Sequence, residues 1–240
     1  MRRNPTKKNI VSFPTAKMEI TLAILGDGSV GKSSLVENFK NDGFTSVYKQ
    51  TVGCDFYEKK LRIRDNAVSL RLWDIGGQSI HSKNIQQYVS TSSAIFLVYD
   101  VTNRESFNNL DDWKRLLTKY GATDKIYLVG NKVDMISQRI VTSKQQIEFI
   151  KDNNLCGGMY MSAKTGENVI RAFYQVSGEI LGTPLTETEL ECHDKILKVH
   201  VLRDDDQGGR TAFADQIEEE KRLEEEEALR RAQQCTCMIQ

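Results

Sequence analysis

The chain has 240 residues, enough for one domain of ordinary size with extensions, and its 33 basic and 33 acidic side chains balance. The charge is uneven, because residues 183–240 hold 15 acidic and 8 basic side chains, a net −7, which leaves +7 on residues 1–182. Neither part has the concentrated positive charge of a nucleic-acid-binding protein, so we expect no nucleic-acid partner.

The cysteines and the apolar runs both favour a cytoplasmic protein. Five cysteines, an odd number scattered along the chain, indicate reduced thiols rather than a disulfide framework. The longest uninterrupted apolar stretch, residues 94–99, is far too short to span a bilayer. The N-terminus also lacks the apolar core of a secretory signal.

Residues 1–18 are predicted to form a flexible basic arm. They contain five basic side chains and no acidic one, and Pro5 and Pro14 disfavour a continuous helix. A mitochondrial transit peptide is the alternative, because such peptides are rich in arginine and poor in acids.

Residues 19–182 alternate short apolar runs with helix-like periods, a pattern that predicts an α/β domain. Strands are predicted at 20–25, 55–64, 68–73, 94–100, 126–130 and 159–162, and helices at 32–41, 104–120, 143–153 and 168–181. Runs 94–99 and 126–129 are apolar throughout, as is typical of parallel strands covered by helices on both faces. Asp65-Asn66 is turn chemistry, so the second and third strands are expected to pair antiparallel at one edge of a mostly parallel six-stranded sheet.

A phosphate-binding motif follows the first predicted strand. Its residues are Gly26-Asp27-Gly28-Ser29-Val30-Gly31-Lys32-Ser33, with the spacing G-x-x-x-x-G-K-[ST], and Ser34 follows as a further expected nucleotide contact. The glycines allow backbone N–H groups to surround phosphate oxygens, Lys32 reaches the β- and γ-phosphates, and the Ser33 hydroxyl binds Mg²⁺. The motif therefore predicts a nucleoside triphosphate site.

The base is predicted from Asn131-Lys132-Val133-Asp134, which follows the predicted strand 126–130. Ligands of α/β sheets bind at this carboxyl edge of the strands. The Asp134 carboxylate can accept hydrogen bonds from guanine N1–H and from the exocyclic amine, donors that adenine does not offer in that arrangement. We expect GTP and GDP, and a P-loop kinase or ATPase is the alternative that Asp134 disfavours.

These two motifs are joined by Trp73-Asp74-Ile75-Gly76-Gly77-Gln78 and by Ser162-Ala163-Lys164, and the order resembles that of Ras-superfamily small GTPases over residues 19–182. Thr51-Val52-Gly53-Cys54-Asp55-Phe56 resembles the effector region of the Rab family, and the run from Trp73 to Gln78 resembles a divergent, farnesylated Rab branch. The resemblance implies the P-loop NTPase fold of small G proteins. It also implies a GTP-binding and GTP-hydrolysing switch in membrane and vesicle trafficking.

The resemblance also assigns contacts with the nucleotide and the metal. Phe44 would stack on the guanine, and the Ala163 N–H would meet its O6. Thr51 and Gly77 would contact the γ-phosphate and so form the switch. The remaining implied residues are Lys132, Ser162 and Lys164 around the base, and Ser33, Thr51 and, through water, Asp74 as ligands of Mg²⁺.

For hydrolysis, the resemblance implies that Gln78 orients the attacking water while Lys32 and Mg²⁺ stabilise the phosphate charge. No arginine occurs in residues 44–52, so we expect slow turnover that a GAP accelerates. A GTP-binding scaffold with negligible hydrolysis is the alternative, and Gln78 argues against it. Expected partners are a GEF, a GAP and effectors, through the regions of Thr51 and Gln78.

Two features of the chain, at residues 75–76 and at residue 79, depart from the Rab pattern. Most Rabs have Thr-Ala where this chain has Ile75-Gly76, and Glu where it has Ser79. Adjacent glycines are expected to loosen the second switch. The missing acid is expected to alter how exchange factors handle the protein.

Residues 183–240 are predicted to be an acidic hypervariable tail. The last four residues, Cys237-Met238-Ile239-Gln240, fit the C-a-a-X prenylation motif, and Gln at the last position favours farnesyl on Cys237. One isoprenoid attaches only marginally, and Cys235 is the candidate for a second lipid. We expect a protein attached peripherally to the cytoplasmic surface of an internal membrane, with the endosome favoured by the resemblance.

Overall fold

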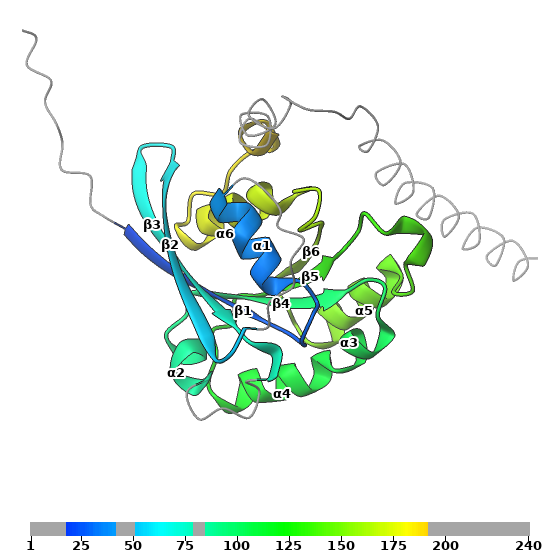
Figure 1. Cartoon of the computed structure of the whole chain (residues 1–240). Coiled ribbons are helices and arrows are strands. Elements are labelled where there is room, and N and C mark those ends of the chain that lie inside the picture. Colours follow the sequence, from blue (N-terminus) through cyan, green and yellow to red (C-terminus); the bar gives the residue numbers. More distant parts are fainter. Residues whose placement is uncertain (1–17, 42–50, 79–84, 192–240) are drawn as a thin grey trace, which may run out of the picture.

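The computed structural model describes residues 18–41, 51–78 and 85–191, and its centre is a six-stranded sheet with the order β2-β3-β1-β4-β5-β6 (Figure 1). The strands are β1 (Met18–Leu25), β2 (Cys54–Ile63), β3 (Asn66–Ile75), β4 (Ala94–Asp100), β5 (Ile126–Asn131) and β6 (Gly157–Met161). Only β2 and β3 pair antiparallel, and every other neighbouring pair is parallel. The predicted sheet with one antiparallel edge strand is confirmed.

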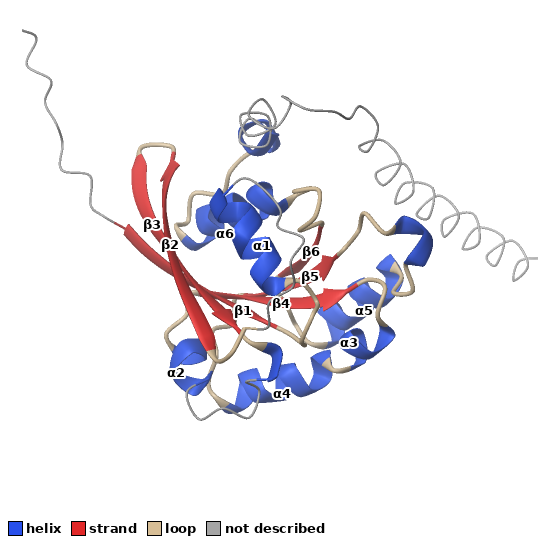
Figure 2. Cartoon of the chain, in the orientation of Figure 1, coloured by secondary structure: helices blue, strands red, loops and turns tan. Residues whose placement is uncertain are grey.

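Helices cover both faces of the sheet (Figure 2). They are α1 (Lys32–Asn41), α2 (Ile85–Ser90), α3 (Arg104–Asn108), α4 (Leu110–Lys119), α5 (Ser143–Asp152) and α6 (Val169–Ile180). Alternate residues of β4 point to opposite faces, so Phe96 and Val98 pack with α1 and α6, whereas Leu97 and Tyr99 pack with the helices of the other face. All seven residues of β4 are buried, which explains its uninterrupted apolar sequence.

The parallel register brings the carboxyl ends of three strands together. Leu25 at the end of β1 lies opposite Leu97, and Asn131 at the end of β5 lies opposite Asp100 at the end of β4. The phosphate motif after β1 and the predicted base motif after β5 therefore meet at one edge of the sheet, where open α/β sheets bind ligands.

One predicted helix is divided in the structure. The sequence pattern predicts a helix over 104–120, but α3 ends before Asn109 and α4 begins after it. The backbone carbonyl of Asn109 accepts hydrogen bonds from the amides of both Asp112 (3.1 Å) and Trp113 (3.2 Å), a tightened turn rather than a regular α-helical one. The apolar period continues across the break, so the pattern alone does not reveal it.

Other elements also differ from the prediction, and β1 and β3 each begin two residues earlier than expected, at Met18 and Asn66. Helix α2 was not predicted, because its six residues are too few to show a helical period. Strand β6 begins at Gly157, two residues earlier than predicted, since the pair Gly157-Gly158 has low strand propensity.

The chain beyond residue 182 continues along the domain as far as it is described. Leu190 is only 2% exposed, and Leu185 packs against the core on the α1 and α6 side. The Arg64 guanidinium in the β2–β3 turn donates to the Pro184 carbonyl (3.0 Å) and to the Glu189 carboxylate (2.9 and 3.1 Å). The start of the predicted tail therefore contacts the edge hairpin, while residues 1–17 and 192–240 lie outside the described part.

Within the described ranges, no helix combines the length and the apolar character that crossing a bilayer requires.

The aromatic packing under α6 generates a stability prediction. The Phe173 ring is 1% exposed and stacks on Phe39 at 4.1 Å between centroids, with Phe96 at 5.2 Å. We expect Phe173→Ala to lower the free energy of unfolding by about 3–5 kcal/mol, because the cavity cannot fully close. Urea denaturation at a fixed GDP concentration measures it. The control is Ile147→Ala at a 53% exposed side chain, expected to change stability by less than about 0.5 kcal/mol; equal losses would contradict the packing argument.

Candidate functional site

The phosphate motif forms a tight loop between β1 and α1. Gly26 and Gly31 have φ angles of 140° and 97°, and Ser29 has a φ of 62°. A Cβ at Gly26 would lie 2.1 Å from the Val98 carbonyl oxygen, and one at Gly31 would lie 2.3 Å from the Asn131 side-chain nitrogen. Gly26 and Gly31 are thus required for two reasons, because a side chain would collide at each position and because each has a positive φ angle.

Lys32 lies at the start of α1 with its side chain inside the loop. It is 5% exposed, and its ammonium donates to the carbonyls of Gly26 (2.8 Å) and Asp27 (2.6 Å). Burial lowers the pKa of Lys32 to about 8, although the negative charges of Asp74 and Asp27 oppose the shift. A phosphate group would relieve this desolvation, so the cation is positioned for an anionic ligand.

Ser33, Thr51 and Asp74 bring three candidate metal ligands together from separate segments. The hydroxyl oxygens of Ser33 and Thr51 are 2.8 Å apart. Asp74 is fully buried, and neither of its carboxylate oxygens has a hydrogen-bond partner within the described residues. The Ser33 hydroxyl also lies close to Asp74, but the hydrogen bond of regular geometry that it makes is the one to Thr51.

Burial is the largest influence on the pKa of Asp74 and raises it, while Ser33 and Lys32 act in the opposite direction. A buried carboxylate without a donor is unfavourable on its own. Hydroxyl and carboxylate oxygens are the ligands that Mg²⁺ prefers, and Mg²⁺ sites with one carboxylate commonly complete their shell with water and phosphate. The donor set therefore fits the predicted Mg²⁺.

The segments that contain Thr51 and Gly77 touch each other and the phosphate loop. The Gly76 amide donates to the Gly53 carbonyl (2.9 Å), and a Cβ at Gly76 would lie 2.4 Å from the Thr51 carbonyl oxygen. A Cβ at Gly77 would lie 2.2 Å from the amide nitrogen of Gly28. The glycine pair, expected to loosen this segment, instead permits a close backbone contact in the structure.

The predicted base-binding residues converge around the Asn131 amide. Asn131 is fully buried, its Nδ2 donates to the Val30 carbonyl (2.7 Å), and its Oδ1 accepts from the Ala163 amide (3.0 Å). The Ala163 N–H, predicted to meet guanine O6, therefore already has a protein acceptor, which it would have to share with the base. Asn131 joins the phosphate loop to the loop after β6.

Asp134 and Lys132 are each held by one partner. The Ser162 hydroxyl donates to Asp134 Oδ1 (2.6 Å) and accepts from the Thr165 amide (3.1 Å), so Ser162 joins Asp134 to the loop after β6. Lys132 forms an ion pair with Asp100 at 2.6 Å. Asp134 Oδ2 is not used by these bonds, and Lys164 is exposed beside this loop.

The remaining predicted residues are less constrained. Gln78 is exposed at the end of the described segment 51–78, and Ser34 lies in the first turn of α1. Phe44 and Cys237 lie outside the described residues, so their predicted roles stay predictions.

An aromatic cluster near the Thr51 segment was not predicted. The ring centroids of Phe56 and Trp73 are 4.7 Å apart, and those of Trp73 and Tyr88 are 4.8 Å apart. Phe56 is 47% exposed, which is unusual for a large apolar side chain beside others of its kind. The alternation of inward and outward residues along β2 could have indicated that Phe56 points outward. The contact of Trp73 with Tyr88 of α2 has no such signal in the sequence.

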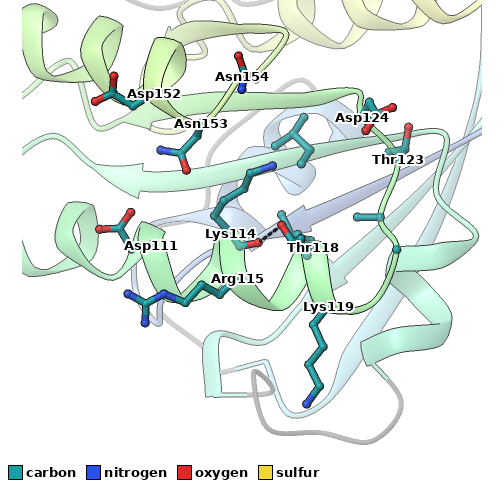
Figure 3. A pocket seen from close by; sticks show the side chains of 14 residues that line it. Asp111, Lys114, Arg115, Thr118, Lys119, Thr123, Asp124, Asp152, Asn153 and Asn154 are labelled. Carbon is teal, nitrogen blue, oxygen red and sulfur yellow. Dashed lines mark hydrogen bonds between the residues drawn. The ribbon is translucent and has the colours of Figure 1, made fainter.

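A hollow of about 900 Å³ lies at the opposite edge of the sheet, between the end of α4, the amino end of β5 and the end of α5 (Figure 3). Its lining mixes cations such as Lys114 and Lys119 with anions such as Asp111 and Asp152. Because the phosphate and base motifs lie at the carboxyl edge, this hollow is separate from the candidate nucleotide site.

A doubly covered parallel sheet with a phosphate loop after β1 and an N-K-x-D loop after β5 defines the class of P-loop guanine-nucleotide-binding domains. The chain belongs to the Ras family, whose model matches residues 21–182.

Its relatives narrow the class further. The chain is 36% identical over 188 residues to the Ras-related protein Rab-28 of Caenorhabditis elegans, covering 76% of this chain and 75% of that one. It is 33% identical to human Ras-related protein Rab-12, over 77% of this chain and 76% of that one. It is 30% identical to Ras-related protein Rab-10 of Caenorhabditis elegans, over 80% of this chain and 96% of that one. These matches confirm a Rab-like small GTPase with a likeness to Rab-28, and a trafficking role is typical of Rabs.

The position of Asp134 generates a test of base recognition. We expect Asp134→Asn to weaken GDP binding at least about a hundredfold, because a charged acceptor of two hydrogen bonds is lost. Xanthosine diphosphate should bind more tightly, since the new amide offers a donor to its C2 carbonyl. Titrations with fluorescent GDP and XDP measure both effects. Asp112→Asn, at an exposed carboxylate of α4, is the control; an Asp134→Asn protein with wild-type GDP affinity would show that Asp134 does not contact the base.

Proposed function

We propose that this chain hydrolyses GTP slowly and uses the GTP and GDP states as a switch, with Mg²⁺ held by Ser33, Thr51 and, through water, Asp74. The observation that supports it best is the meeting of the Ser33 and Thr51 hydroxyls at 2.8 Å close to a buried carboxylate without a hydrogen-bond partner in the described residues. Bound Mg²⁺ would neutralise charge on the β- and γ-phosphates.

The residues around the phosphates have separate tasks in this proposal. Lys32 would exchange its carbonyl acceptors for phosphate oxygens, because its desolvated ammonium gains most from a charged partner. Gln78 would orient the attacking water, and its exposed side chain leaves access to solvent. Residues 44–52 contain no arginine, so rapid turnover would depend on an arginine supplied by a GAP.

The switch itself would depend on the contact between Thr51, Gly77 and the phosphate loop. The Gly77 backbone already lies against Gly28 without any intervening side chain. A γ-phosphate bound at this place would contact both Thr51 and the Gly77 amide, and its loss would release both segments. The exposed ring of Phe56, with Trp73 and Tyr88, offers an apolar surface beside the switch for effectors, and a GEF and a GAP would act on the same segments.

Gln78→Leu should retain GTP affinity and slow hydrolysis by about tenfold or more, because leucine cannot orient water while the phosphate contacts stay intact. Single-turnover release of phosphate from preloaded GTP measures the rate, and a filter-binding assay measures the affinity. The alternative, a GTP-binding scaffold with negligible hydrolysis, predicts equal and minimal rates for both proteins. That outcome would refute the enzymatic role of Gln78.

We further propose that Cys237 carries a farnesyl group and attaches the protein to the cytoplasmic surface of an internal membrane, endosomes by analogy with Rabs. The supporting observation is the C-a-a-X sequence at 237–240. The net −7 charge of residues 183–240 is repelled by anionic lipids, so lipid rather than charge would have to hold the protein.

Cys237→Ser should move the protein into the soluble fraction without changing nucleotide exchange, because residue 237 lies outside the proposed GTPase domain of residues 19–182 in the sequence. The Cys235→Ser control should release it only in part. Cell fractionation, combined with intact-mass measurement of the lipid, tests both. Membrane attachment retained in Cys237→Ser, or an unmodified wild-type Cys237, would place the anchor elsewhere, with the basic segment 1–18 the next candidate.

A further inference from the structure

The side chain of Asp27, inside the phosphate loop, is held by the helices on the far side of the loop. Its Oδ2 accepts a hydrogen bond from Asn109 Nδ2 (2.7 Å), and its Oδ1 accepts one from the Trp113 indole N–H (2.8 Å). Both carboxylate oxygens are therefore used, and each bond is short because the acceptor is charged.

The main chain of the same residue faces the reaction centre. The Asp27 carbonyl accepts from the Lys32 ammonium (2.6 Å), and a Cβ at Gly77 would lie 2.4 Å from the Asp27 carbonyl carbon. Asp27 thus joins the junction of α3 and α4 to the phosphate-binding lysine and to the second switch.

The Asn109 side chain is used for this long-range contact, because its backbone does not allow the usual local one. Asn109 occupies the N-cap position of α4, but its backbone is helical (φ −71°, ψ −8°), whereas an asparagine whose side chain accepts a capping hydrogen bond from a helix amide usually has an extended backbone. Its side chain makes no such bond. It reaches Asp27 instead, 82 residues away in the sequence, while Asn103 at the start of α3 does cap its helix in the usual way.

The loop needs support from outside itself. Ser29, two residues after Asp27, is a non-glycine residue with a φ of 62°, a conformation that the surrounding structure has to support. Trp113 is a rigid donor for this purpose, because it is 1% exposed within the core under the sheet.

We propose that Asn109 and Trp113 are positioning residues for the phosphate site. They fix the Asp27 carboxylate, and through it the carbonyl and amides that hold Lys32 and the phosphates. This inference rests on the GTP and GDP binding proposed above, and it adds two residues that touch no nucleotide. Releasing Asp27 should speed nucleotide dissociation and slow hydrolysis, while the preference for guanine, set by the loop of Asp134, stays unchanged.

Exchanging the two side chains that form the hydrogen bond between Asp27 and Asn109 tests the proposal. In Asn109→Asp, two carboxylates would face each other at hydrogen-bond distance, and mantGDP should dissociate about tenfold faster or more, the equivalent of one charge-assisted hydrogen bond. Adding Asp27→Asn to that variant restores an amide facing a carboxylate, and the oxygen of the new amide can accept from Trp113. The double variant should therefore return to within about threefold of the wild-type rate.

Milder variants keep the test valid if Asn109→Asp folds poorly. Asn109→Ala and Trp113→Phe each remove one donor without adding charge, and each should speed mantGDP dissociation and slow single-turnover hydrolysis. The matched control is Tyr127→Phe, which removes a hydrogen bond to Glu179 (2.6 Å) on the other face of the sheet. It should change the unfolding temperature alone.

The outcomes separate this proposal from the proposed function. Wild-type dissociation rates in all three single variants of Asn109 and Trp113, or a double variant as fast as Asn109→Asp, would show that the contact only stabilises the fold and would overturn the positioning role. A wild-type protein that binds no mantGDP would instead refute the nucleotide site itself. Faster dissociation with recovery in the double variant, at an unchanged ratio of GDP to ADP affinity, is the result that we expect.

Discussion

The nucleotide site depends on one buried amide, the side chain of Asn131 at the end of β5. It donates to the phosphate loop at Val30 and accepts from Ala163 in the loop after β6, so two loops far apart in the chain share one anchor. Because Asn131 is fully buried, an unmade bond would leave a polar group without water, a penalty of about 1–3 kcal/mol for each group. The same amide explains why Gly31 has no side chain, since a Cβ there would lie 2.3 Å from it.

The charged groups of the structure differ in how far burial removes them from water. Lys32 and Asp74 are both buried, and desolvation moves the pKa of each toward its neutral form. The Arg64 ion pair with Glu189 lies at the surface, where water screens the attraction between the two charges. Electrostatic strain is therefore concentrated where a phosphate and a cation would relieve it, a distribution typical of functional sites.

The contacts between the segments of Thr51 and Gly77 and the phosphate loop are made by backbone atoms. Thr51, Gly76 and Gly77 approach one another and Gly28 so closely that a single added carbon would collide. An arrangement of this kind has little room for intermediate positions, because packed backbone cannot deform continuously. Gly76 stands where most Rabs carry an alanine, so the close approach of its backbone to Thr51 depends on a residue that departs from the Rab pattern.

The sequence by itself determined the class of the protein. The phosphate motif, the N-K-x-D motif and their order predict the nucleotide, and the limits of α1 and β4 agree with the apolar pattern because both are local properties of the chain. The mostly parallel character of the sheet and its antiparallel edge pair followed from the alternation of strands and helices, together with the turn chemistry of Asp65-Asn66.

Only the tertiary structure decided which side chains meet. Ser33 reaches Thr51 across 18 residues, and Asp27 reaches Trp113 across 86. The tertiary structure also decided the division of the predicted helix at Asn109 and the cluster of Phe56, Trp73 and Tyr88. Both depend on how the helices pack against the sheet. Periodicity reports the face on which a residue lies, but the partner on that face depends on strand register and helix placement, which no local pattern encodes.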